Sequence, residues 1–214
     1  MKARDNLLRA VRDGLDRAGF DAAAVKQEAD QLLEALPRAR PDLRGLSAVD
    51  VFICRLCSPK VAATLDRIDD MAELPAAVAR YLTAKGLQLR VALQPTAQLR
   101  AIQWRGFALV DAPDTNELVG IGLADVGIAE TGSLVFHSGP ETPVLAHFLP
   151  LHHIVLLHQS SIVMYLDDYA ATLRPDGPVF RNINIITGPS GTTDIEGKLV
   201  LGAHGPCHLH VVLL

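Results

Sequence analysis

The sequence predicts an α/β fold in which helices cover both faces of a mainly parallel sheet, a three-layer arrangement. Three observations support this class. Strand-like apolar runs alternate with amphipathic segments along most of the 214 residues. Within residues 61–93, a helical pattern lies between two strand patterns, an order that favours a crossover between parallel strands. The apolar fraction of 49% indicates a folded globular chain rather than a disordered one.

Residues 1–45 are predicted to form a helical appendage to an α/β domain at 46–214. Apolar residues recur at helical spacing within 2–19. Asp21 is placed to cap a second helix that runs to about Leu36, where we expect Pro37 and Pro41 to stop it. The apolar stripes of both helices need a partner, which is either the core of this chain or another subunit.

The α/β region is expected to alternate strands and helices to its end. Residues 47–57 fit either a helix capped by Ser47 or a short buried strand, and we favour the helix. Residues 119–137 form two apolar arms around a glycine turn, which is typical of a strand and its antiparallel return. Further strands are expected at 61–68, 87–93, 104–110, 153–158, 183–186 and 209–214, the last three buried, and further helices at 70–84 and from Ser160 or Ser161 to Leu173.

The glycine turn at 130–133 is the first candidate site. A carboxylate held at a tight turn can act as a nucleophile or a general base, so Glu130 is a candidate catalytic residue. Its neighbours Thr131, Gly132 and Ser133 are candidate ligand-binding residues. The alternative is structural: Glu130 accepts hydrogen bonds from the backbone of the turn or pairs with an arginine.

A second candidate site lies between the two C-terminal strands, where small and hydroxyl-bearing residues precede two acids. Free backbone N–H groups at the start of a helical turn bind anions, and side-chain hydroxyls would supplement them. Ordinary helix capping by the same residues explains the pattern equally well. The candidate ligand-binding residues are Gly188, Ser190, Gly191, Thr192 and Thr193, and the candidate catalytic residues are Asp194 and Glu196.

All eight histidines lie in the second half of the chain. His204 lies on a glycine-containing turn where it can meet the two acids, so it is a further candidate catalytic residue. Strand alternation places His208 and His210 on one face and the neighbouring Cys207 on the other, so no zinc site is expected. The remaining histidines near the 153–158 strand lack the spacing of metal ligands and are interpreted as strand-end and interface residues: His147, His152, His153 and His158.

The three cysteines do not suffice for a redox centre. Cys54 and Cys57 are interpreted as small buried apolar residues, and Cys207 is distant in sequence. A zinc ribbon or an iron–sulfur cluster needs four ligands of suitable spacing, which this chain alone does not supply. We therefore expect neither a metal nor another cofactor.

Two blocks, GIAETGSLVF at 127–136 and GPS-x-T-x-DIE followed by GxHGP near the C-terminus, resemble the LUD-domain family over roughly residues 118–214. Gly191 departs from the family pattern, which often has a basic residue there. The resemblance implies the α/β variant shared by sugar-phosphate isomerases and CoA transferases, relatives of which place a glutamate at a comparable turn to attack a thioester. It also implies a component of a cytoplasmic system that oxidises L-lactate to pyruvate together with iron–sulfur partner proteins.

Two other functions stay open at this point. In the first, the chain is a stand-alone enzyme or a binding protein for a phosphorylated or CoA-linked organic acid, and residues 188–193 bind a small anionic ligand. In the second, the chain is a pure interaction subunit. We expect the glycine turn at 130–133 and the loop at 188–196 to face one shared cleft, because both follow strands of one sheet and such sheets bind ligands beyond their strand ends.

Composition limits the location and the partners of the protein. No apolar run reaches the length of a membrane span, and the N-terminal residues lack the apolar core of a signal peptide, so we expect a cytoplasmic protein. The net charge is −4 without a basic patch, which argues against a nucleic-acid partner.

Overall fold

The computed structural model describes residues 2–14, 21–43, 45–110, 118–174, 176–193 and 196–214. The chain divides into two compact units, Met1–Pro41 and Asp42–Leu214, and each is described by itself. No helix among the described residues is long and apolar enough to cross a membrane.

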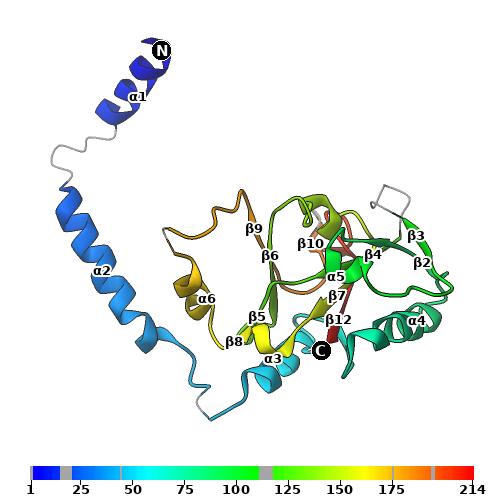
Figure 1. The fold of residues 1–214 in the computed structure, drawn as a ribbon. Coiled ribbons are helices and arrows are strands. Elements are labelled where there is room, and N and C mark those ends of the chain that lie inside the picture. Colours follow the sequence, from blue (N-terminus) through cyan, green and yellow to red (C-terminus); the bar gives the residue numbers. More distant parts are fainter. Residues whose placement is uncertain (1, 15–20, 44, 111–117, 175, 194–195) are drawn as a thin grey trace. The chain divides into compact units, whose positions relative to one another are not determined.

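Two helices make up the described part of the first unit, α1 Lys2–Gly14 and α2 Ala22–Ala39 (Figure 1). Asp21 caps α2 as predicted, since its carboxylate accepts a backbone hydrogen bond of 2.9 Å from the first turn. α2 continues for two residues past the first predicted stop, Pro37, and ends before the second, Pro41. The helix ends at Arg40, whose extended backbone is typical of a residue that precedes proline.

A six-stranded sheet forms the centre of the second unit (Figure 1). Its strand order is β1-β12-β7-β4-β2-β3 and every neighbouring pair is parallel, which confirms the predicted α/β class. The strands are β1 Thr64–Arg67, β2 Arg90–Leu93, β3 Ala108–Val110, β4 Val119–Leu123, β7 His152–Leu157 and β12 His208–Leu213.

Helix α4 (Leu74–Ala84) covers one face of this sheet, after a short helix η1 (Met71–Glu73). Its buried side chains, including Leu74 and Leu82, pack against apolar residues of β2, β4, β7 and β12. The short helix α5 (Ala97–Arg100) adds Leu99 to the same core. Each such side chain contributes about 1.5–3 kcal/mol when it is fully buried.

The opposite face is covered by α3 (Ala48–Leu56) together with a second, four-stranded sheet, which completes three layers. Phe52 and Leu56 of α3 share one core with Phe136 of the second sheet and Val155 of the central sheet. The order of the second sheet is β8-β5-β6-β9, and its strands are β5 Val126–Ile128, β6 Ser133–His137, β8 Ile162–Val163 and β9 Ile183–Ile186.

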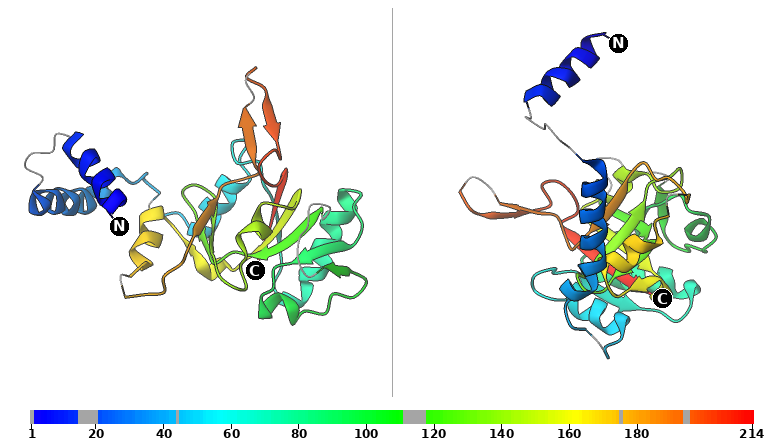
Figure 2. Two further views of the ribbon diagram at one scale, coloured as in Figure 1. Left: turned by 90° about the horizontal axis from the view of Figure 1, so that it is seen from above. Right: turned by 90° about the vertical axis from the view of Figure 1, so that its left-hand side faces the viewer.

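A hairpin and a short helix complete the described fold. Strands β10 (Gly191–Thr193) and β11 (Leu199–Leu201) pair antiparallel and extend away from the two sheets (Figure 2). After β7 the sequence predicts one helix from Ser160 or Ser161, but the chain forms a short helix η3 (Gln159–Ser161), then β8, and only then α6 (Leu166–Thr172). Pairing of β8 with β5 overrides the local helical preference.

Two predictions of burial are wrong. β9 was expected to be a buried strand, yet it is an edge strand of the second sheet, with Ile183 and Ile185 38% and 45% exposed. Cys54 and Cys57 are also exposed. Helix α3 turns Phe52 and Leu56, one helical turn apart, toward the core, and Cys54 lies between them on a different side.

Candidate functional site

A cavity of about 200 Å³ lies over the N-terminal ends of β7 and β12, on the side of the central sheet that faces the second sheet. It contains three residues that the sequence singles out: Gly188, Ser190 and His204. Its other walls are mostly apolar. They consist of His147, Phe148, His153, Ile185, Ile186, Gly205, Pro206 and Leu209.

Two buried histidines distinguish this cavity. His147 is fully buried and His153 is 1% exposed. Both ring nitrogens of His147 and Nδ1 of His153 have no hydrogen-bond partner among the described residues. The ring centroids of the two histidines lie 5.5 Å apart, and the ring of Phe136 lies 4.1 Å from that of His147. Buried polar groups are normally paired, so these nitrogens are unusual for a folded protein.

The low polarity around the two histidines keeps them uncharged. Burial lowers the pKa of His147 from its ordinary value of 6.5 to about 4. Burial, and next the neighbouring His147, lower the pKa of His153 to about 3. At neutral pH each imidazole therefore offers one N–H donor and one nitrogen acceptor.

Strand alternation explains how the chain places these side chains. β7 begins with His152 and His153, and consecutive strand residues point to opposite faces, so His153 faces the second sheet while His152 faces α4. His147 ends the short helix η2 (Val144–His147) that precedes β7. Gly122 on the neighbouring strand leaves room for His153, because a Cβ there would lie 2.9 Å from its Nε2.

The glycine turn between β5 and β6 is built for packing. Gly132 has φ +70°, and a Cβ there would lie 2.7 Å from the backbone N of Leu56 in α3. Glu130 Oε1 accepts a 2.7 Å hydrogen bond from the N–H of Leu166, the first residue of α6. This contact is structural, but its donor lies in α6 and not in the turn, so it differs from the expected hydrogen bonds to the backbone of the turn.

The two segments singled out by sequence lie at the same end of the second sheet. β5 and β9 both run antiparallel to β6, so they are parallel to each other and their C-terminal ends coincide. A chain of hydroxyl groups joins the segments: Thr131 Oγ1 lies 2.7 Å from Ser133 Oγ, which lies 2.6 Å from Thr187 Oγ1. Gly188 follows directly, with φ +78° and a close approach to the carbonyl oxygen of Val61.

The prediction of a helical turn after Ser190 is wrong. Gly191, Thr192 and Thr193 form β10, because they pair with β11 in the hairpin. Their backbone groups therefore take part in strand pairing instead of forming the N-terminus of a helix. Glu196 is exposed and lies 3.2 Å from Lys198 Nζ. Asp194 lies outside the described residues, so a cleft shared by Asp194 and Glu130 stays a prediction.

The C-terminal histidines divide between the two faces of the sheet. His204 is exposed at the mouth of the cavity. His208 and His210 share the opposite face, as alternation predicts: the His210 ring stacks on Tyr81 at 4.4 Å, and the His208 ring stacks on His152 at 4.4 Å. Within the described ranges, no three His, Cys, Asp or Glu side chains are grouped to hold a metal ion.

Hydrogen bonds fix most of this second histidine cluster. The Tyr81 hydroxyl lies 2.9 Å from His152 Nδ1, and Thr64 Oγ1 lies 2.8 Å from His210 Nδ1. Burial is the main cause that lowers the pKa of both His152 and His210 to about 4. The cluster packs against α4, and two of its ring nitrogens have partners while the buried Nε2 of His210 has none among the described residues, so we interpret it as a structural element.

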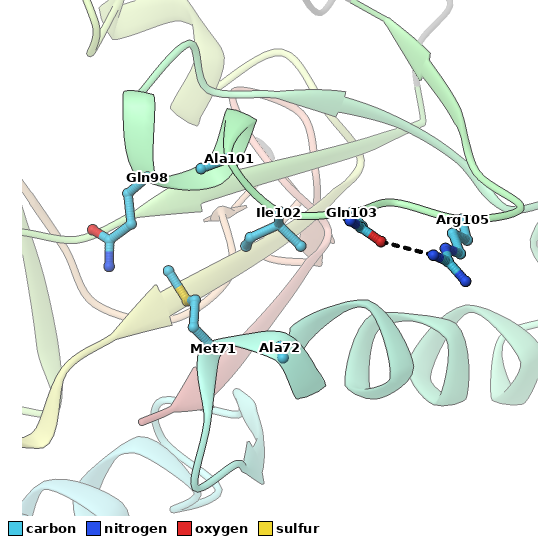
Figure 3. Close-up of a pocket in the computed structure, with 7 residues that line it drawn as sticks. All are labelled: Met71, Ala72, Gln98, Ala101, Ile102, Gln103 and Arg105. Carbon is cyan, nitrogen blue, oxygen red and sulfur yellow. Dashed lines mark hydrogen bonds between the residues drawn. The ribbon is translucent and has the colours of Figure 1, made fainter.

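A larger cavity, of about 580 Å³, opens between η1 and the segment that begins with α5 (Figure 3). Its polar side chains already have partners. Gln98 Nε2 lies 3.0 Å from His158 Nε2, and Arg105 donates a 3.0 Å hydrogen bond to Gln103. We therefore place the candidate site at the smaller cavity, where buried polar atoms are unpaired.

Sequence reasoning missed the two histidines at the centre of this site. His147 and His153 were interpreted as strand-end residues because they show no ligand spacing. The useful signal is the adjacent pair at 152 and 153, which begins a fully apolar run and must place one histidine on each face of a buried strand.

Comparison with known proteins identifies the part of the chain that builds this cavity. Residues 116–214 match the family described as LUD domain. This segment is similar to a LUD domain. The match agrees with the resemblance over residues 118–214, and every described residue that lines the cavity lies within the matched segment.

Relatives from two bacteria that are similar to this chain have the same name. The chain is 40% identical over 92 residues to "Lactate utilization protein C" of Geobacillus kaustophilus, which is 41% of this chain and 38% of that protein. It is 36% identical over 100 residues to the protein of the same name from an Exiguobacterium species, or 45% of this chain and 44% of that protein. The chain thus spans less than half the length of either relative.

A solved structure supports the fold. A DUF162 family protein from Deinococcus radiodurans superimposes with a TM-score of 0.53 over 78% of this chain and 98% of that chain. The sequence identity is 21%, so this likeness concerns the α/β architecture alone.

Proposed function

We propose that this protein is a component of a lactate-utilisation system. One observation carries the proposal: the LUD domain, whose relatives are named for lactate utilisation, is the segment that builds the cavity with unpaired buried histidines. Unpaired polar groups in a cavity reduce stability, and such groups persist where a ligand uses them.

In this proposal the system oxidises L-lactate to pyruvate in the cytoplasm, and iron–sulfur partner proteins accept the electrons. The thiols of this chain support such a division of labour. Cys54 and Cys57 are exposed together at the end of α3, whereas the sulfur of Cys207 lies 3.7 Å from the carbonyl oxygen of Leu201 beside the hairpin. Two thiols are too few to hold a cluster by themselves.

Genetic deletion tests this role. A strain that lacks the gene should grow normally on pyruvate and slowly on L-lactate, and a plasmid copy should restore growth on L-lactate. Affinity purification of the plasmid-encoded protein from lactate-grown cells should recover iron–sulfur proteins, detected by their visible absorbance and iron content. Normal growth of the deletion strain on L-lactate would contradict the proposal.

The alternative, a stand-alone enzyme or binding protein for a phosphorylated or CoA-linked acid, has less support. Among the described residues that line the cavity there is no Lys or Arg, and a buried phosphate needs cationic partners. Its proposed base, Glu130, caps α6. Dye reduction by the purified chain alone with L-lactate would count against the proposed role, because we expect none from a component that depends on partners.

A further inference from the structure

The end of helix α3 carries two exposed thiols. Cys54 lies in the last turn of α3, and Cys57 is the residue that caps its C-terminus. Both cysteines are exposed. Residues three positions apart lie on the same side of a helix, with Cβ atoms about 5–6 Å apart. The two thiols are therefore neighbours that a reagent in solution reaches.

The backbone at this helix end permits a disulfide between them. A disulfide needs Cβ atoms about 3.5–4.5 Å apart, so the two cysteines have to approach each other by about 1–2 Å. Cys57 has φ −85° and ψ 2°, and its N–H donates to Ile53 O at 3.0 Å, after which the chain leaves the helix. Helix ends fray and rearrange more readily than helix interiors, so the last turn absorbs this movement.

The two sulfur atoms already influence each other. Partial desolvation of its thiol, and next the neighbouring Cys54, raise the pKa of Cys57 above its ordinary value of 9.0. The C-terminus of a helix disfavours negative charge as well. The Cys57 thiol is therefore mostly protonated at neutral pH, and Cys54 is close enough for its charge to matter.

The backbone between the two thiols supports the glycine turn at 130–133. A Cβ at Gly132 would lie 2.7 Å from the backbone N of Leu56 and 3.0 Å from the carbonyl carbon of Arg55. Contacts this close leave no slack, so a displacement of the helix end reaches the turn directly.

The second glycine segment rests on the same stretch of chain. Gly188 approaches the carbonyl oxygen of Val61, four residues past Cys57. Both glycine segments that the sequence singles out thus pack on residues 55–61, and this stretch begins between the two cysteines.

We propose that Cys54 and Cys57 form a modification site at which a small disulfide oxidant converts the two thiols to an intramolecular disulfide and thereby moves the backbone beneath Gly132. The thiolate of one cysteine attacks a sulfur of the oxidant, which forms a mixed disulfide and releases one thiol. The second cysteine then attacks the sulfur of the first and releases the other thiol. The protein loses two electrons and two protons, and the oxidant takes them up as two thiols.

This site goes beyond the lactate-utilisation role and does not depend on it. Reversible disulfides in a reducing compartment are typical of redox sensing rather than of structural support. Cys207 offers an internal comparison, since its sulfur lies beside the hairpin, 3.7 Å from the carbonyl oxygen of Leu201, and no cysteine lies within three positions of it in the sequence.

Mass spectrometry of the full chain tests the site. The reduced protein is incubated with oxidised glutathione at about pH 8.5, where more thiolate is present, and the remaining thiols are then alkylated. Trypsin cleaves after Arg55, so the disulfide joins peptides 45–55 and 56–60, which reduction separates. We expect at least about tenfold more of the joined peptides than of glutathione adducts on either cysteine, because the second thiol is held close to the mixed disulfide. Glutathione adducts without joined peptides, or disulfides only between molecules, overturn the proposal.

Two variants separate the steps of the reaction. Cys57→Ser should stop at the mixed disulfide and accumulate a glutathione adduct on Cys54, because the second thiol is missing. Cys207→Ser should form the Cys54–Cys57 disulfide like the wild type. Equal yields of the Cys54 adduct in the wild type and in Cys57→Ser contradict the proposal, since Cys57 would then take no part in the second step.

Hydrogen exchange measures the effect on the glycine turn. The N–H of Gly132 donates to Ile128 O at 2.9 Å, so its exchange rate reports on the geometry of the turn. Formation of the disulfide should change this rate by at least about threefold and leave the amides of β7 unchanged. Cys57→Ser treated in the same way is the control and should keep the rate of the reduced protein. An unchanged rate at Gly132 in protein shown to contain the disulfide refutes the movement beneath the turn.

Discussion

Replacement of His147 by leucine should stabilise the fold. The imidazole is fully buried and neither ring nitrogen has a partner among the described residues. An unsatisfied buried polar group costs about 1–3 kcal/mol, and leucine removes that cost. The same change removes the ring contact with Phe136 at 4.1 Å, worth about 0.5–1.5 kcal/mol. The difference is a gain of about 1 kcal/mol in the free energy of unfolding.

Urea and thermal unfolding at pH 7.5 or above measure this gain, since the buried histidines are then neutral in both states. A gain of about 1 kcal/mol raises the Tm by about 3 °C in a chain of this size. The control His158→Gln, which changes a partly exposed side chain, should stay within about 0.5 kcal/mol of the wild type. A His147→Leu variant that is less stable than the wild type would refute the reasoning, because the ring nitrogens would then stabilise the native state.

Three further predictions concern pH, the glycine turn and Glu130. Burial lowers the pKa of His147, His152 and His210 from 6.5 to about 4, so the unfolded chain binds more protons than the folded chain between these values. The free energy of unfolding should therefore be highest above pH 6.5 and fall toward pH 4, by up to about 1.4 kcal/mol per pH unit for each histidine. Urea titrations at several pH values measure this fall, and a free energy of unfolding that does not change with pH would contradict the prediction. Gly132→Ala should lower the free energy of unfolding by about 3 kcal/mol, because its φ is +70° and its Cβ would meet α3. The control Gly139→Ala, whose Cβ would lie in open space, should stay within about 0.5 kcal/mol of the wild type. Equal unfolding midpoints for the two variants would exclude the close contact at Gly132. Glu130→Ala should lower the free energy of unfolding by about 1 kcal/mol, because the first residue of α6 loses its hydrogen bond to the carboxylate; an unchanged urea midpoint would contradict this.

The sequence predicts the central sheet well because its strands carry their own signal. The run at 209–214 is apolar apart from His210, and β12 is indeed buried between two layers. The helical crossover between β1 and β2 shows the same agreement, since α4 presents apolar residues at helical spacing to one core.

The second sheet is harder to predict because its edges are set by long-range pairing. β9 has the composition of a buried strand, yet it pairs only with β6 and leaves Ile185 largely open to solvent. The hairpin of β10 and β11 likewise replaces an expected helical turn, because residues 199–201 provide a pairing partner that local patterns do not show.

The candidate site is only partly predictable for a related reason. Gly188, Ser190 and His204 stand out by motif and do line the cavity. His147 and His153 enter it only because η2 and β7 fold beneath the second sheet, and burial of a side chain by a distant layer leaves no local pattern.

Growth of the deletion strain on L-lactate, with His147→Leu or His158→Gln as the plasmid copy, tests the account most directly. Both proteins must first be shown to accumulate to the wild-type level. The account predicts that His158→Gln restores growth and that His147→Leu fails to do so, although it is the more stable protein. Full restoration of growth by His147→Leu would contradict a role of the histidine cavity in lactate utilisation.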